Sequence, residues 1–118
     1  MTNTDSILAS ARKTILSEGE SITALVNYLD EDFAHTARII FNTKGRLVVT
    51  GIGKSAIIAS KIVATLNSTG TPSVFLHAAE AIHGDLGMVQ PGDVVLCISK
   101  SGNSPEIKVL VPLLKRFG

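Results

Sequence analysis

Three short apolar segments, each followed by a loop and a helical segment, constrain the fold of this chain more than any other feature. They read "RLVVTG" (46–51), "SVFLH" (73–77) and "DVVLCIS" (93–99). β-branched apolar runs of this length are typical of strands buried on both faces. Because each run is followed by a helical segment, the alternation predicts an α/β fold with a parallel sheet.

The segments between the strands have helical patterns. We expect a helix over about 55–67 after the first strand, a short segment "AAEAIHGDLG" after the second, and a helix that opens at Ser104-Pro105 after the third. Ser104 is a typical N-cap residue, and proline is favoured in the first turn of a helix. The dipeptide Pro91-Gly92 predicts a tight turn before the third strand.

Two helices are expected in the first 45 residues. The apolar face of the first is indicated by a recurrence at i, i+3, i+4 and i+7, in Ile22, Leu25, Val26 and Leu29. Gly19 is expected to interrupt this helix. The second helix has Asp30 or Asp32 near its start and Gly45 near its end. Its expected inward residues are Phe33, Ala37, Ile40 and Phe41.

Size and charge limit the function classes. The chain has 118 residues, which predicts one domain, and no apolar run approaches the roughly 18–20 residues of a membrane span. Its formal net charge is +1, with no basic cluster and with only four Phe and one Tyr. These features predict a soluble, cytoplasmic protein that acts on a small molecule, with no nucleic acid or membrane partner. The single cysteine, Cys97, is interpreted as a buried strand thiol.

The segment "VVTGIGKSAIIAS" (48–60) has three interpretations. A Walker phosphate loop requires glycine at the position of Val48, so the sequence disfavours this first interpretation. A dinucleotide fingerprint is matched by Gly51, Gly53 and Ala56, but the second strand ends at a histidine, not at the acidic residue that such a site uses. The favoured interpretation is a phosphate site without a nucleotide, in which the helix N-terminus supplies free N–H groups beside Lys54 and Ser55.

A second polar loop, "SKSGNSPE" (99–106), follows the third strand. Its three serines, Ser99, Ser101 and Ser104, are individually typical of turns and helix caps. Together they lie at the carboxyl end of a parallel strand, which is the edge where open α/β sheets bind ligands. Hydroxyls and free amides bind phosphate without a metal, and we therefore favour a binding role.

Three segments, "GIGKS", "STGTPSVFLHAAEAIHGDLGMVQPGD" and "ISKSGNSPEI", together resemble the sugar isomerase (SIS) domain and, within it, the arabinose 5-phosphate isomerases. The similarity runs from about residue 5 to the end of the chain, and "EAIHGDLGM" is its most discriminating part. The resemblance implies a flavodoxin-like three-layer sandwich. It also implies interconversion of ribulose 5-phosphate and arabinose 5-phosphate for an eight-carbon acid sugar of bacterial envelopes.

The resemblance further implies roles for individual residues. It implies that the phosphate is held by Ser55, Ser99, Ser101 and Ser104. It implies that Gly70 and Thr71 line the sugar, and that His83 also contacts it. It implies that catalysis depends on Lys54, His83 and Glu106, and that His77 is a zinc position.

The residue types fit an enediolate mechanism, in which a proton leaves the carbon beside the carbonyl and returns to its neighbour. Lys54 is suited to the oxyanion or the phosphate, His83 to proton transfer between sugar oxygens or to ring opening, and Glu106 to the base. The alternatives remain a solvated lysine, a loop-capping histidine and a structural first-turn acid. No redox cofactor is required.

The spacing H-x-x-E-x-x-H over His77, Glu80 and His83 is compatible with a metal site. On a helix, positions i and i+3 share a face while i+6 drifts away, so three ligands from this segment are not expected. The remaining expectation is no required metal, with an incidental or inhibitory zinc at His77.

The resemblance also concerns completeness and assembly. SIS domains ordinarily have five parallel strands, and a further glutamate and histidine that the family uses would lie beyond Gly118, so we expect an N-terminal fragment with little isomerase activity of its own. We expect residues 1–45 to form N-terminal helices with oligomer contacts, residues 46–118 to form three strand-helix units, and the assembly to be a homotetramer. The alternatives to an isomerase are a non-catalytic sugar-phosphate sensor and a structural fragment. Residues 1–45 contain no basic recognition helix, which favours the enzyme.

Overall fold

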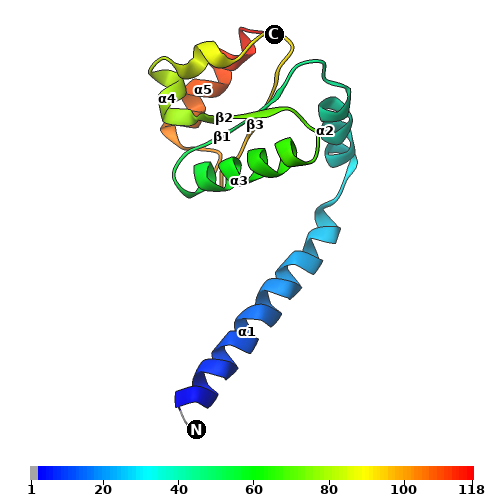
Figure 1. The fold of residues 1–118 in the computed structure, drawn as a ribbon, viewed down its shortest axis with the longest axis vertical. Helices are drawn as coiled ribbons and strands as arrows, with labels where there is room; N and C mark the ends of the chain where they lie inside the picture. Colours follow the sequence, from blue (N-terminus) through cyan, green and yellow to red (C-terminus); the bar gives the residue numbers. More distant parts are fainter. Residues whose placement is uncertain (1–2) are drawn as a thin grey trace. The chain divides into compact units, whose positions relative to one another are not determined.

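The computed structural model describes residues 3–118, which form two compact units (Figure 1). The first unit extends through Arg38, and the second runs from Ile39 to Gly118. Within residues 3–118, no helix combines the length and the apolar character needed to cross a membrane.

The first unit is helical. Helix α1 spans Asn3–Ala24, and a 3-10 helix follows at Leu25–Tyr28. The expected interruption at Gly19 is wrong: α1 continues through it, because one exposed glycine costs a helix only about 1 kcal/mol. The expected single helix face ending at Leu29 is also wrong, because Leu29 is extended (φ −74°, ψ 123°) and leads into the cap of the next helix.

Helix α2 spans Glu31–Asn42, across the boundary between the units. Its predicted start is confirmed, since Asp30 Oδ1 accepts the Phe33 N–H at 3.0 Å. The prediction that its apolar residues all face inward is wrong for Phe33 and Phe41, which are 60% and 88% exposed, and for Ala37, which is exposed. Only Ile40 packs against the core. Periodicity identifies an apolar face but not what covers it.

The second unit contains the predicted parallel sheet. Its strands are β1 (Leu47–Gly51), β2 (Ser73–His77) and β3 (Val94–Cys97), in the order β2-β1-β3. Both strand pairs are parallel. The three strand predictions and the sheet type are confirmed.

Helices cover both faces of the sheet, so the expected three-layer α/β sandwich is confirmed (Figure 1). Helix α3 (Lys54–Ser68) covers one face, and α4 (Ala78–Ile82) and α5 (Pro105–Lys115) cover the other. The cluster on the α3 side is built on Leu47, Val49 and Ala59. The cluster on the other side contains Val48, Leu76, Ala78, Ala81, Val89, Ile107 and Leu110. Alternate residues of β1 point to opposite faces, which explains why all of β1 is buried.

At the amino edge of the sheet, an ion pair joins the start of β1 to the turn before β3. Arg46 Nη2 lies 2.9 Å from Asp93 Oδ2, and the same nitrogen donates to the Met88 carbonyl at 2.6 Å, at the end of the 3-10 helix Asp85–Met88. The predicted turn at Pro91-Gly92 is confirmed by the Asp93 N–H bond to the Gln90 carbonyl and by φ +91° at Gly92.

Candidate functional site at the carboxyl edge of the sheet

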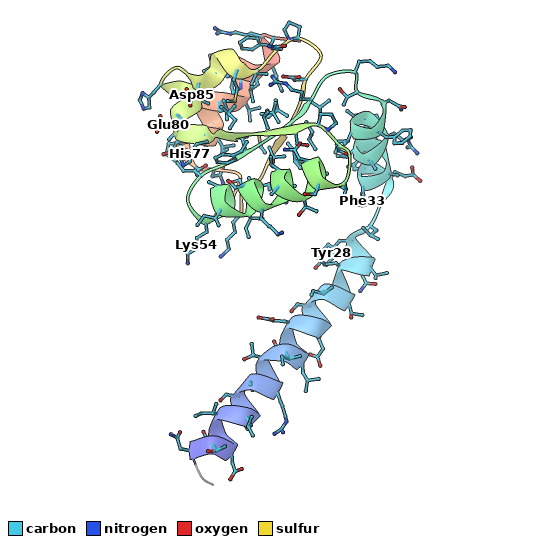
Figure 2. All side chains as sticks on the ribbon, in the orientation of Figure 1. Tyr28, Phe33, Lys54, His77, Glu80 and Asp85 are labelled. Carbon is cyan, nitrogen blue, oxygen red and sulfur yellow. The ribbon has the colours of Figure 1, made fainter. Side chains whose placement is uncertain are left out.

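The three strands end together at one edge of the sheet, because they are parallel. The chain leaves β1 at Gly51, β2 at His77 and β3 at Cys97, and each exit leads into a helix. Figure 2 shows Lys54 and His77 at this edge. In an open α/β sheet this edge is where ligands bind.

The first loop depends on two glycines. A Cβ on Gly51 would lie 3.0 Å from the Ser55 carbonyl carbon, so glycine permits the close approach of β1 to helix α3. Gly53 has φ +61°, a conformation that residues with a Cβ rarely adopt. The loop therefore delivers Lys54, which is exposed, and Ser55, which is half-buried, at the first turn of α3.

The loop after β3 is shaped by its own serines. The Ser99 Oγ accepts the Gly102 N–H at 2.9 Å, and the Ser101 Oγ accepts the Asn103 N–H at 3.1 Å. A hydroxyl that accepts one bond still has its own proton to donate. At this sheet edge, the Ser99 and Ser101 hydroxyls are therefore oriented by local bonds and each keeps a proton to donate.

Ser104 differs from the other two serines. It precedes α5 with extended dihedral angles (φ −60°, ψ 140°), which confirms it as the N-cap position, yet its side chain forms no cap hydrogen bond. Its Oγ is buried and has no partner among the described residues. A buried hydroxyl without a partner costs free energy, so a ligand oxygen at this place would satisfy it.

The segment after β2 positions two histidines. His77 Nδ1 accepts the Ala79 N–H at 3.2 Å and so caps α4. The His77 ring lies edge-on to Phe75, with ring centroids 6.2 Å apart. His83 occupies the C-cap of α4 and is exposed. Glu106 lies in the first turn of α5 and is half-buried.

The charged candidates are available to a ligand. Among the residues that the structure describes, neither Lys54 nor Glu106 forms a salt bridge, and the Arg46–Asp93 pair lies at the opposite edge of the sheet.

Cys97 is half-buried at the end of β3, and burial raises the pKa of its thiol. A raised pKa disfavours the thiolate, so this cysteine is poorly suited to nucleophilic chemistry.

The structure does not bring Gly70 and Thr71 to the carboxyl edge. They follow α3 and precede β2, at the amino end of the strand, where the Thr71 N–H bonds to the Leu66 carbonyl. Gly70 has φ +93°, as expected for the residue that ends a helix. Their role in lining a sugar stays a prediction.

The zinc position implied at His77 does not fit the hydrogen bonds of its ring. In neutral imidazole one nitrogen carries the proton and the other has a free lone pair. Because Nδ1 accepts the Ala79 N–H, the proton is on Nε2. Among the residues described, no three His, Cys, Asp or Glu side chains form a group that could hold a metal ion, including His77, Glu80 and His83.

Sequence reasoning missed the role of Thr50. Its Oγ1 donates to the Leu76 carbonyl, and its own carbonyl accepts the Ile98 N–H at 2.9 Å. Thr50 is fully buried and links the carboxyl ends of all three strands. The available signal was a hydroxyl in an otherwise apolar strand segment, which predicts a hydrogen-bond partner once it is buried.

Comparisons with known proteins agree with the fold. The SIS domain family model matches residues 39–118. The arabinose 5-phosphate isomerase KdsD of Pseudomonas aeruginosa is 49% identical over 109 residues, which are 92% of this chain and 33% of that protein. The arabinose 5-phosphate isomerase GutQ of Escherichia coli K12 is 46% identical over 111 residues, which are 94% of this chain and 35% of that protein.

Solved structures agree as well. An Escherichia coli CFT073 protein in complex with arabinose 5-phosphate superposes with a TM-score of 0.91 and 42% identity, covering 100% of this chain and 62% of that one. The curated relatives are longer still, and the chain spans about a third of their length.

Proposed function

Because the chain belongs to the SIS domain family, we propose that the carboxyl edge of its sheet binds the phosphate of a sugar phosphate. The observation that carries this proposal is the loop of residues 98–104. It combines two oriented hydroxyls with the buried, unpartnered Ser104 Oγ. Ser55, at the first turn of α3, adds a further hydroxyl at the same edge. These groups suit an anion with several acceptor oxygens.

We further propose an aldose–ketose isomerisation in which ribulose 5-phosphate and arabinose 5-phosphate exchange through an enediolate. The names of the similar relatives support this reaction class. Glu106 is suited to take the proton from the carbon beside the carbonyl and return it to the neighbouring carbon. Lys54 would stabilise the oxyanion, and His83 would move the proton between the sugar oxygens. No step in this scheme needs a redox cofactor.

The proposal includes assembly and cellular role. We propose that the protein is a cytoplasmic homo-oligomer, a tetramer by its resemblance to the family, and that it supplies the sugar phosphate for a bacterial envelope sugar. The exposed apolar side chains of α1, among them Ile15, Leu16 and Ile22, support self-association.

The test is a calorimetric titration of the chain with arabinose 5-phosphate and, separately, with arabinose. We expect binding that requires the phosphate, and equal responses to the two sugars would contradict the phosphate site.

A second experiment, isomerisation in deuterated water, distinguishes catalysis from binding alone. Deuterium at the carbon beside the carbonyl supports the enediolate. Phosphate-dependent binding without any turnover, in a protein that also carries the family's further glutamate and histidine, would instead favour the sensor function.

A further inference from the structure

His77 ends β2 and begins α4, and its ring has a defined hydrogen-bonding state. The Nδ1 atom accepts the Ala79 N–H, so the remaining proton of the neutral ring is on Nε2. Histidine is an uncommon N-cap residue, but here its Nδ1 does what the oxygen of Asn or Asp does in other helices. The edge-on contact with Phe75 also fixes the plane of the ring.

The capped helix connects His77 to His83. Ala78 and Ala81 of α4 are buried, with exposed fractions of 0% and 1%, in the cluster that contains Leu110 of α5. The N-cap of α4 is His77 and its C-cap is His83. A helix of five residues has few hydrogen bonds of its own, so its end groups and its buried face determine whether it forms.

We propose that His77 is a positioning residue that caps α4 through Nδ1 and thereby positions His83, the C-cap residue of the same helix, and that its ring is not a metal ligand. A metal would need a lone pair on one ring nitrogen. The Nδ1 lone pair accepts the Ala79 N–H, and Nε2 carries the proton. Metal binding at this ring would therefore require the cap to break.

The first test measures the cap without any ligand. In the 118-residue chain at pH 8, nitrogen NMR of the His77 ring should show the proton on Nε2 and an acceptor bond at Nδ1. His77→Ala should increase the exchange rate of the Ala79 amide about fivefold, as expected from an N-cap worth about 1 kcal/mol. His77→Asn, which keeps an acceptor, should restore the protection. An Ala79 amide that exchanges equally in the wild type and in His77→Ala would overturn the proposal.

Zinc is the second probe. Equimolar zinc should leave the His77 ring signals and the Ala79 amide of the wild type unchanged. A zinc-dependent shift of the ring signals at His77 would overturn the exclusion of a metal. His77→Asn serves as the control, because it identifies which ring signals belong to His77.

The third probe rests on the proposed function and is read separately from the first two. His77→Ala should weaken binding of arabinose 5-phosphate about fivefold, and His77→Asn should restore it. If His77→Asn protects the Ala79 amide but does not restore binding, the ring acts on the ligand directly and the positioning role is wrong. If the wild-type chain binds no sugar phosphate, the proposed function fails while the cap is still tested by the Ala79 amide.

Discussion

Ser101 contributes one of the two hydroxyls held by the loop after β3. Its oxygen accepts the Asn103 N–H, and its proton is left to donate. Ser101→Ala should weaken arabinose 5-phosphate binding by roughly ten- to a hundredfold, because a hydrogen bond to a charged group contributes about 1.5–3 kcal/mol. Calorimetry on the purified variant measures this change.

Ser68→Ala is the matched control for this substitution. Ser68 also has an exposed hydroxyl with one local bond, to the Ala64 carbonyl, but it lies at the far end of α3. The control should bind as the wild type does. Unchanged affinity in Ser101→Ala would remove this hydroxyl from the binding site.

At the level of single residues, some features of the candidate site could be predicted from the sequence and others could not. The serines and Lys54 were identified from their positions after strands, which is a property of the chain order. The cap formed by His77 and the links formed by Thr50 depend on bonds to backbone atoms that no residue pattern specifies. The separation of Gly70 from the serine loop, by contrast, follows from chain order, since Gly70 precedes β2 and the serine loop follows β3 in a parallel sheet.

At the scale of elements, the strands were predicted closely because three apolar runs are bounded by turn residues on both sides. The predicted strand 73–77 and the observed Ser73–His77 have the same bounds. The helices before β1 were predicted less well. Their apolar side chains are largely exposed in this chain, so contact with a core does not determine which apolar residues share one helix face. Leu29 continues the apolar helical period, but its backbone is extended, and the next residue, Asp30, caps α2.

The pairing of Arg46 with Asp93 joins β1 to the turn before β3. The Asp93 side chain is only 3% exposed, and hydrogen bonds from Arg46 lower the pKa of its carboxyl from 3.8 to about 2. A carboxyl with a lower pKa in the folded state stabilises that state fully at pH values above its unfolded pKa. We expect a loss of about 2 kcal/mol of unfolding free energy as pH falls from about 5 to about 2.

Urea unfolding at a series of pH values tests this expectation. Asp93→Asn should remove this part of the pH dependence and lower stability at neutral pH. Asp85→Asn changes an exposed carboxylate in the same unit and should leave the dependence intact. An identical acid dependence in the wild type and in Asp93→Asn would show that the ion pair does not contribute.

At the scale of the whole molecule, the apolar surface of the first unit predicts self-association. Ile22 and Leu25 are 68% and 58% exposed, in α1 and in the 3-10 helix that follows it. Light scattering should report a homo-oligomer, and Ile22→Glu with Leu25→Glu should reduce its mass, because charges are costly to bury. Glu18→Gln on α1 is the control. A wild-type chain that is a monodisperse monomer would contradict the assembly.

The most direct test of the proposed binding edge is a backbone amide NMR titration of the 118-residue chain with arabinose 5-phosphate. The structure predicts the largest shifts in residues 52–55 and 98–106, where the loops after β1 and β3 lead into α3 and α5. Arabinose without phosphate should leave these amides unchanged. The largest shifts at residues 43–46 and 90–93, around the Arg46–Asp93 pair at the amino edge, would contradict the account.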